Sequence, residues 1–208
     1  SIVRNVLLRP LPYRHPSTLV QVISMSRKSG DSYGYGWAPL RDAYDWKTMV
    51  PAFRDVAVYG YALLNLKSAG HAETLYGSAV TANLLPMLGV RPQLGHWFAD
   101  GTDRPGAAHV IILSDDMWRR EFNADPQIVG KTIQMDDEGY QVVGVMPRGF
   151  NFPLRLATTA LLPTDQMQYW VPRTVDLAKS PHGLANAGVI ARLKDGVTQA
   201  EAQEQLQA

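Results

Sequence analysis

One stretch, residues 109–152, limits the possible folds of this chain more than any other, because its structural signals follow one another without a break. The apolar run at residues 109–113 predicts a buried strand. Ser114 then occupies the position of a helix N-cap, with Asp115 and Asp116 in the first turn, where carboxylates favour the positive end of the helix dipole. We therefore expect a strand that leads directly into a short helix. The apolar face of this helix would consist of Met117, Trp118 and Phe122.

The second half of this stretch predicts a β-hairpin. Strand-forming residues at 132–135 and 140–146 flank the polar sequence Asp-Asp-Glu-Gly at 136–139, which ends in the glycine expected of a turn. Pro147 and Gly149 would end the second strand. The stretch therefore predicts one buried strand, one short helix and one hairpin in direct succession.

Other helix signals are few and short. A helix is predicted at residues 39–50, in which Leu40, Ala43, Tyr44 and Lys47 would share one face. The remaining helix signals are Asn83 as the cap of a helix to Leu88, Asp125-Pro126 as the start of a helical turn that ends at Gly130, and Thr198 with Glu201 as a capping box.

The other patterned segments are rich in β-branched and aromatic residues, which favour strands. Two composition groups result. Residues 14–66 and 164–208 give strand, helix and strand and then strand and helix, and the residues between them give hairpins with short helices. The predicted strands outside residues 109–152 are 18–25, 53–66, 72–81, 168–172 and 186–193.

The bulk composition excludes several classes of protein. The chain has 208 residues and a formal net charge of +1, and this balance argues against a dedicated nucleic-acid binder, which usually carries a basic stripe. It contains no cysteine, so its fold needs no disulfide. Its uncharged apolar runs are far shorter than the ~20 residues that span a bilayer. Its first residues also lack the charged and apolar regions of a signal peptide.

Four segments occur in a fixed order along the chain. They are LLRPLPYRHPSTLV (residues 7–20), GSAVTANLLPMLGVRPQLGHWF (77–98), the stretch VIILSDDMWRREFNADPQIVGKTIQMDDEGYQVVGVMPRGFNFP (110–153) and ARLKDGVTQAEAQEQL (191–206). No single motif is specific, but in this order they resemble the MacB-type periplasmic domain of ABC-transporter permeases and their duplicated-permease relatives.

The resemblance implies an α+β fold, in which a small α/β Sabre-like subdomain of hairpins and short helices is inserted into a discontinuous porter-like βαβ subdomain. We expect a membrane-exit connector at residues 1–13, the porter-like subdomain at 14–66 and 164–208, and the Sabre-like subdomain at 67–163. Residues 1–8 look like the tail of the family's first transmembrane helix. We therefore expect the chain to be a piece of a longer permease.

The resemblance also implies a non-catalytic domain on the periplasmic face of the bacterial inner membrane, anchored by transmembrane helices outside this chain. The resemblance further implies that a separate cytoplasmic ABC ATPase hydrolyses ATP. In agreement with this, Gly34-Tyr35-Gly36 lacks the Lys-Ser/Thr of a P-loop. Expected partners are a second permease copy or paired periplasmic domain, a periplasmic adaptor, and exported peptide, lipid or drug, but no nucleic acid. Residues 147–149 and the loop after Pro153 are candidate joints. The sequences at 81–92 and 103–107 favour the duplicated branch.

No metal or cofactor site is predicted. No two histidines have the i, i+3 or i, i+4 spacing of a helical metal site, and cysteine ligands are absent. The acidic turn at residues 136–139 lacks the alternating ligands and terminal Glu of a calcium loop. The histidines are His15, His71, His96, His109 and His182.

Catalytic residues are not predicted either. Ser114 lacks a G-x-S-x-G context, and helix electrostatics explains Asp115 and Asp116 without chemistry. One alternative is a soluble hydrolase, which needs one of these carboxylates to meet a histidine in a concave pocket. Another is an extracytoplasmic sensor or ligand-binding module, which needs an apolar cavity between the subdomains.

Trp118, Arg119 and Arg120 could form a contact patch, because Trp and Arg are enriched in interface hot spots. A core Trp beside two solvated arginines is the favoured interpretation. The remaining aromatic candidates are expected to be core anchors: Trp97, Phe98, Phe150, Phe152 and Trp170.

Overall fold

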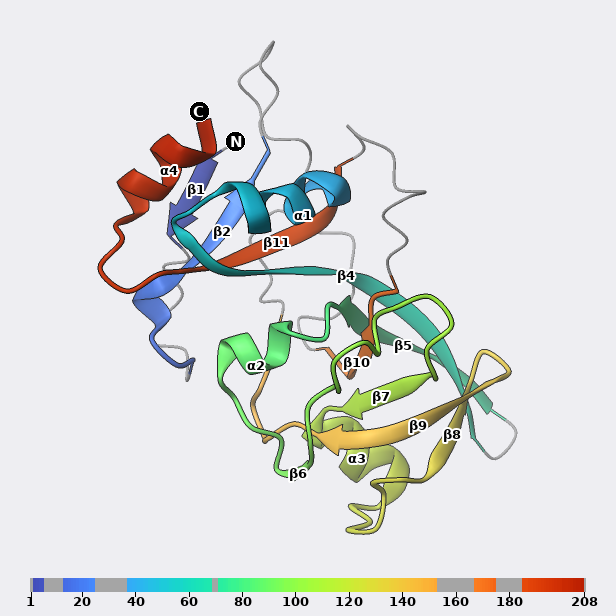
Figure 1. Ribbon diagram of the computed structural model, residues 1–208. Helices are drawn as coiled ribbons and strands as arrows, with labels where there is room; N and C mark the ends of the chain where they lie inside the picture. Colours follow the sequence, from blue (N-terminus) through green and yellow to red (C-terminus); the bar gives the residue numbers. More distant parts are fainter. Residues whose placement is uncertain are drawn as a thin grey trace. The chain divides into compact units, whose positions relative to one another are not determined.

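The computed structural model of the chain describes residues 2–5, 13–24, 37–68, 71–152, 167–174 and 185–207. Strands dominate these ranges and the helices are short, which confirms the α+β class (Figure 1). The strands are β1 (Ile2–Asn5), β2 (Leu19–Ile23), β3 (Ala38–Pro39), β4 (Phe53–Ser68), β5 (His71–Val80), β6 (Leu94–Gly95), β7 (Val110–Leu113), β8 (Thr132–Met135), β9 (Glu138–Val145), β10 (Tyr169–Pro172) and β11 (Ala185–Leu193). The helices are α1 (Leu40–Met49), α2 (Leu84–Leu88), α3 (Asp115–Phe122) and α4 (Gln199–Gln207), with the 3₁₀ helix η1 (Pro16–Thr18).

Residue contacts divide the chain into two compact units. The terminal unit consists of Ser1–Tyr59, Met87–Val90 and Asp176–Ala208, and the central unit consists of Gly60–Pro86 and Arg91–Val175. One unit is therefore built from both ends of the chain and the other from its middle. The names porter-like and Sabre-like stay predictions for these two units.

The unit boundaries differ in detail from the boundaries expected after residues 66 and 163. The chain passes from the terminal to the central unit within β4, after Tyr59, and returns after Val175. A single long strand carries no composition change at its midpoint, so the sequence offers no signal there. The segment Met87–Val90 also belongs to the terminal unit, although the residues on both sides of it do not.

The terminal unit is an antiparallel sheet with the strand order β1-β2-β11-β4, and β3 also pairs with β11. β2 is buried along its whole length. Gly188 of β11 lies under the ring of Tyr59, since a Cβ at this glycine would come within 2.1 Å of Tyr59 Cζ. A side chain at this position would therefore displace a buried aromatic ring.

α1 covers this sheet with a narrower apolar face than predicted. Leu40 and Ala43 are buried. Lys47, which was expected on the same face, is exposed and forms an ion pair of 3.0 Å with Asp55. The long side chain lies on the surface because a neighbouring strand supplies a carboxylate there.

α4 begins with the predicted capping box, which is confirmed. Thr198 N donates to Glu201 Oε2 at 2.7 Å, and Glu201 N donates to Thr198 Oγ1 at 3.2 Å. Gln205 Oε1 accepts a hydrogen bond of 2.6 Å from Ala52 N, and this bond ties the helix to the chain just before β4.

The expectation that the first residues are the tail of a helix is wrong for residues 2–5. These residues form β1, which pairs antiparallel with β2 from Ile2 opposite Ile23 to Asn5 opposite Val20. β-Branched Ile2 and Val3 favour an extended backbone, and the free edge of β2 supplies the hydrogen-bond partners that a short helix would lack.

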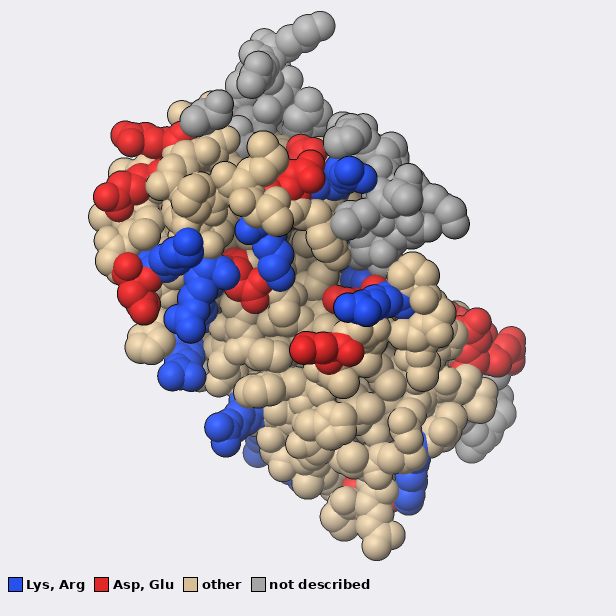
Figure 2. Space-filling view, in the orientation of Figure 1, with Lys and Arg blue, Asp and Glu red and all other residues tan. Residues whose placement is uncertain are grey.

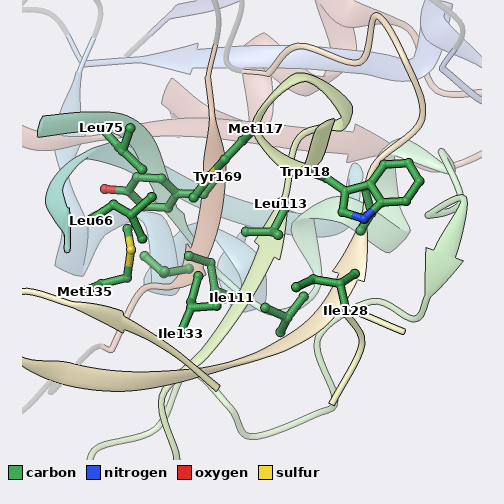
Figure 3. Packing of buried hydrophobic residues seen from close by; sticks show 13 residues of the cluster. Leu66, Leu75, Ile111, Leu113, Met117, Trp118, Ile128, Ile133, Met135 and Tyr169 are labelled. Carbon is green, nitrogen blue, oxygen red and sulfur yellow. The ribbon is translucent and has the colours of Figure 1, made fainter. Parts of the chain in front are cut away.

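The central unit is a mixed sheet with the order β4-β5-β10-β7-β9-β6, and β8 pairs with both β9 and β4. β10 runs parallel to β5, and β7 runs parallel to β9. Figure 3 shows the buried cluster of this unit, in which the Tyr169 ring lies among Leu66, Leu75 and other aliphatic side chains. Met117 and Trp118 of α3 belong to the same cluster, as predicted.

The β8–β9 hairpin is confirmed, but its turn is shorter than predicted. Met135 pairs with Glu138 and Gln134 pairs with Gly139, so only Asp136 and Asp137 form the loop. Both have positive φ angles, 48° and 68°. A two-residue loop with this backbone matches the twist of the strands, and Asp tolerates it, so the glycine is not needed in the turn.

The helical turn predicted at Asp125-Pro126 is also wrong. Residues 125–130 form turns without a helix. The Asp125 carboxylate accepts a hydrogen bond of 2.9 Å from Gln127 N, and Ile128 N donates to Asp125 O at 3.2 Å. An Asp side chain that caps its own turn competes with helix formation.

Candidate functional site

The junction of β7 and α3 is the strongest candidate site of the sequence, and it is used for structure. Ser114 has extended backbone angles, and its Oγ accepts a hydrogen bond of 3.1 Å from Met117 N, as expected for an N-cap. Its own N–H donates to Gln168 O at 2.8 Å. The hydroxyl group therefore stabilises the start of the helix, and the geometry shows no base that would activate it.

Asp115 is a buried carboxylate with two side-chain donors. Arg119 Nε and Gln93 Nε2 each donate to it at 2.7 Å, and only 2% of its side chain is exposed. The Arg119 hydrogen bond, and secondly the Gln93 hydrogen bond, hold the pKa of Asp115 below its usual value despite burial. The same Gln93 amide donates to Met146 O at 2.9 Å, so this carboxylate connects α3 to the end of β9.

The hydrolase alternative requires a histidine beside one of these carboxylates. Within the described ranges, no histidine hydrogen-bonds to Asp115 or to its exposed neighbour Asp116. The hollow next to them has a volume of about 40 Å³, whereas small-molecule sites occupy roughly 300–1,000 Å³. This part of the chain therefore lacks the space and the base that the hypothesis needs. The hollow is lined by Ser114, Asp115, Asp116, Pro147, Gly149, Phe150, Asn151 and Met167.

His109 and His96 contact different partners. His109 Nδ1 is 3.0 Å from Glu138 Oε2, and its ring stacks on Tyr140 with centroids 5.1 Å apart. His96 Nδ1 lies 2.7 Å from Trp97 O. In the part of the chain that the structure describes, no three His, Asp or Glu residues are grouped to hold a metal ion. His182 and the side chain of His71 lie outside the described part.

The acidic turn after β8 ties two hairpins together. Asp136 Oδ1 accepts hydrogen bonds from Asn65 N at 3.0 Å and from Asn65 Nδ2 at 2.6 Å. Asp136 N returns a bond of 3.0 Å to Asn65 O, and Thr74 Oγ1 donates to Asn65 Oδ1 at 2.7 Å. These contacts connect β4, β5 and the β8–β9 turn, so the carboxylate serves the fold.

The Trp118 group supports the interpretation of a core aromatic beside surface arginines. Trp118 is buried, and its Nε1 donates to Asp125 O at 2.9 Å. Arg119 pairs with Asp115 and lies 5.2 Å from the Trp118 ring centroid, while Arg120 pairs with Glu121 and with Glu73. Both guanidinium groups already have carboxylate partners within the unit. These carboxylates neutralise the positive charge that would otherwise attract a partner protein.

Most of the other aromatic candidates are core residues. Trp170 is fully buried, its Nε1 donates to Phe152 O at 2.7 Å, and its ring lies 5.1 Å from that of Phe150. Phe98 is buried and Trp97 is half-buried. Packing accounts for the four buried rings without a binding role.

Sequence reasoning missed one functional candidate, Arg192 of β11. Its Nη1 donates to Thr18 Oγ1 at 2.6 Å and to His15 O at 3.1 Å. Its Nη2 donates to Met87 O at 2.6 Å and to Arg14 O at 2.8 Å. A lone arginine in a strand pattern has no signal that predicts acceptors so far away in the sequence.

The comparison with known families decides the identity. The model of the MacB-like periplasmic core domain family matches residues 2–208. The chain belongs to this family. No curated protein matches the chain.

Solved structures show the same MacB-like fold at low sequence identity. The periplasmic region of MacB from Actinobacillus actinomycetemcomitans is 14% identical, with a TM-score of 0.64, over 91% of this chain and 80% of that chain. A domain of a permease protein from Porphyromonas gingivalis is 15% identical, with a TM-score of 0.61, over 89% of this chain and 79% of that chain. The extracellular domain of the noncanonic ABC-type transporter YknZ from Gram-positive bacteria is 13% identical, with a TM-score of 0.58, over 86% and 84%.

The chain is therefore a periplasmic domain of a MacB-like ABC-transporter permease. None of its described helices is long and apolar enough to span a bilayer. In this MacB-like domain, the candidate residues Ser114, Asp115 and Asp136 form hydrogen bonds that stabilise a helix cap, a contact between α3 and β9, and a turn.

Proposed function

We propose that this domain is a non-catalytic coupling element. It would transmit the motion of flanking transmembrane helices to contacts with partner proteins or exported cargo. The observation that carries this proposal is the position of the two ends: β1 and α4 pack against each other within the terminal unit (Figure 1). Two membrane helices that flank such a chain would both pull on this one unit.

The chain connections support transmission to the central unit. β4 is one continuous strand of 16 residues, which starts in the terminal unit and ends in the central unit. A movement of the terminal unit would therefore reach the central unit through this strand, and bending of the strand would change the distance between the two units. The joint expected at residues 147–149 lies inside the central unit, so it is not a passage between the units.

The partners of such a domain would be a second permease copy or paired periplasmic domain, a periplasmic adaptor, or exported cargo. ATP hydrolysis by a cytoplasmic ABC ATPase would drive the movement, and the transmembrane part of the permease would contact this ATPase. The family supports this assignment, and the inner bacterial membrane would be the anchoring site.

The absence of cysteine allows a direct test of coupling. Met49 in the terminal unit and Leu63 in the central unit are exposed by 73% and 55%, so M49C and L63C can carry a pair of fluorophores. In the complete transporter in liposomes, ATP should change the distance between the two labels. The matched control is the same pair in a transporter whose ATPase cannot hydrolyse ATP. An unchanged distance during ATP turnover would contradict coupling.

The non-catalytic part of the proposal has its own test. The purified chain should hydrolyse neither ATP nor common ester and peptide substrates. Turnover that persists through purification, and that D115N abolishes, would instead support the hydrolase alternative.

A further inference from the structure

Three arginines of the terminal unit lie close together, and none of them forms an ion pair with a carboxylate among the residues that the structure describes. Arg192 of β11 is half-buried, and its four hydrogen bonds go to three main-chain carbonyls and one hydroxyl group. These acceptors satisfy the N–H groups of Nη1 and Nη2 without neutralising the charge of the side chain. Arg14 and Arg54 are exposed, and no ion pair joins either of them to a described residue.

The backbone places these side chains beside one another. Arg192 pairs with Asp55, but the next residue, Leu193, pairs with Phe53. Arg54 is therefore the extra residue of a β-bulge, a device that redirects a side chain at the edge of regular pairing. Arg14 is held against the same region, because its carbonyl accepts a hydrogen bond from Arg192 and its N–H donates to Leu88 O at 3.0 Å.

The charges of Arg14 and Arg54 both act on the guanidinium group of Arg192. Burial lowers the pKa of Arg192 most, and the charges of Arg54 and Arg14 lower it further. Asp195 raises the pKa of Arg192, and its contribution is the smallest. The nearby Asp55 forms a 3.0 Å ion pair with Lys47. The cluster therefore keeps a local positive charge, although the net charge of the whole chain is only +1.

Figure 2 shows basic side chains gathered along one flank of the terminal unit. Like charges at short range repel each other, so such a grouping is unfavourable until an anion approaches. We propose that Arg14, Arg54 and Arg192 form a contact surface for an acidic segment of a partner protein. This inference deepens the proposed function and rests on it, since it names the surface through which the coupling domain would meet a partner.

The arrangement favours a peptide segment over a single phosphate group. The donors of Arg192 on Nη1 and Nη2 are occupied, so the guanidinium groups cannot close around one small anion. Arg14 and Arg54 are available for separate carboxylates, and Arg pairs with carboxylates through a planar fork. Arg192 would act as a positioning residue that holds Arg14 and supplies charge.

The test is a titration of the ¹⁵N-labelled chain with an octaglutamate peptide at low ionic strength. We expect amide shifts confined to residues 13–18, 53–56 and 192–195, and about fivefold weaker binding for the R14Q/R54Q variant. Both substitutions should preserve the fold, because the hydrogen bonds of Arg14 use its main chain and Arg54 is exposed. The matched control is R104Q/R148Q, which removes the same charge from two exposed arginines of the central unit.

Equal weakening by both double variants would overturn the proposal, because it would show binding to overall charge. Shifts produced by inorganic phosphate or by phosphatidylglycerol vesicles, but not by the peptide, would also overturn it. If only this inference fails, the peptide does not bind, but the ATP-dependent distance change between M49C and L63C is still observed. If the proposed function fails, that distance change is itself absent.

Discussion

Different kinds of contact stabilise the interior of each of the two units. Much of the central unit follows from signals that lie close in sequence: β7, the Ser114 cap and α3 follow one another, and β8 and β9 form a local hairpin, although β10 also pairs with the distant β5. The terminal unit depends on distant partners, since β11 pairs with β2 and β4, which lie far towards the N-terminus. Local signals can be recognised in a sequence, whereas distant partners become visible only in the fold.

Two arginines illustrate this difference. Arg119 of the central unit pairs with Asp115 at a spacing of i, i+4 on one helix. Arg192 of the terminal unit binds main-chain acceptors of residues 14, 15 and 87. The first pair follows from helix geometry. The second network requires three separated segments to have assembled already.

The largest effect should come from the packed core of the central unit. A Cβ at Gly77 would lie 2.3 Å from the ring of Tyr169, which is fully buried. We expect G77A to lower the free energy of unfolding by about 3 kcal/mol, because neither group can move away. Urea unfolding measures this change. G139A is the matched control, since its Cβ would meet the ends of two side chains on the surface, Thr132 Cγ2 at 3.0 Å and Gln134 Nε2 at 3.7 Å. A loss for G139A as large as that for G77A would contradict the packing explanation.

A second prediction addresses the distant network of the terminal unit. R192M removes four hydrogen bonds and should cost about 2 kcal/mol, because the part-buried Met87 carbonyl and Thr18 hydroxyl lose their donor. Hydrogen exchange should accelerate at the Arg14 amide, which bonds to Leu88 O. R54M is the control, as Arg54 is exposed. Unchanged exchange at Arg14 in R192M would show that the network does not hold this segment.

The acid dependence of the central unit gives a third prediction. Because the pKa of Asp115 is lowered in the native state, the unfolded chain binds this proton more tightly. The stabilisation from the ionised carboxylate is present above the unfolded pKa of about 3.9 and is lost as the pH falls through the native pKa.

We therefore expect D115N to lower the free energy of unfolding by about 1.5 kcal/mol at neutral pH. The variant should also lose less stability than the unaltered chain between neutral and strongly acidic pH. Urea unfolding across this range measures both effects. D116N carries the same charge change at an exposed neighbour and should alter the profile less. Identical profiles for D115N and the unaltered chain would exclude the role assigned to Asp115.

The smallest effects should come from the helix caps, one in each unit. S114A should cost about 1 kcal/mol, because a buried N–H of Met117 loses its acceptor. T198A should cost about 0.5 kcal/mol, because water can replace the exposed cap. Thermal unfolding of both variants compares them directly, with S114T and T198S as conservative controls. A larger loss of stability for T198A than for S114A would contradict the expected ranking of the two caps.

Local patterns predicted most elements of both units. The caps at Ser114 and Thr198 and the strand that precedes α3 are confirmed. The errors arose where a side chain or a neighbouring strand supplied a better partner than the local pattern indicated. Asp125 caps its own turn, and the edge of β2 turns residues 2–5 into a strand.

The candidate site was predicted only in part. The sequence placed Ser114 and Asp115 at a helix start, but it did not reveal that Gln93 bonds to this carboxylate. It likewise could not show that Asn65 holds Asp136, or that Arg192 gathers Arg14 and Arg54 in one region. These groups have no periodic relation to their partners, so no spacing rule could find them.

By itself, the sequence determined the order and type of most elements, two of the caps, and the likeness to a MacB-like periplasmic domain, because these depend on neighbours along the chain. The tertiary structure alone decided which strands meet, where the two units divide, and which arginines face carbonyls instead of carboxylates. Those outcomes depend on contacts between distant residues, and such contacts form only when burial of the whole core offsets the entropy of bringing them together.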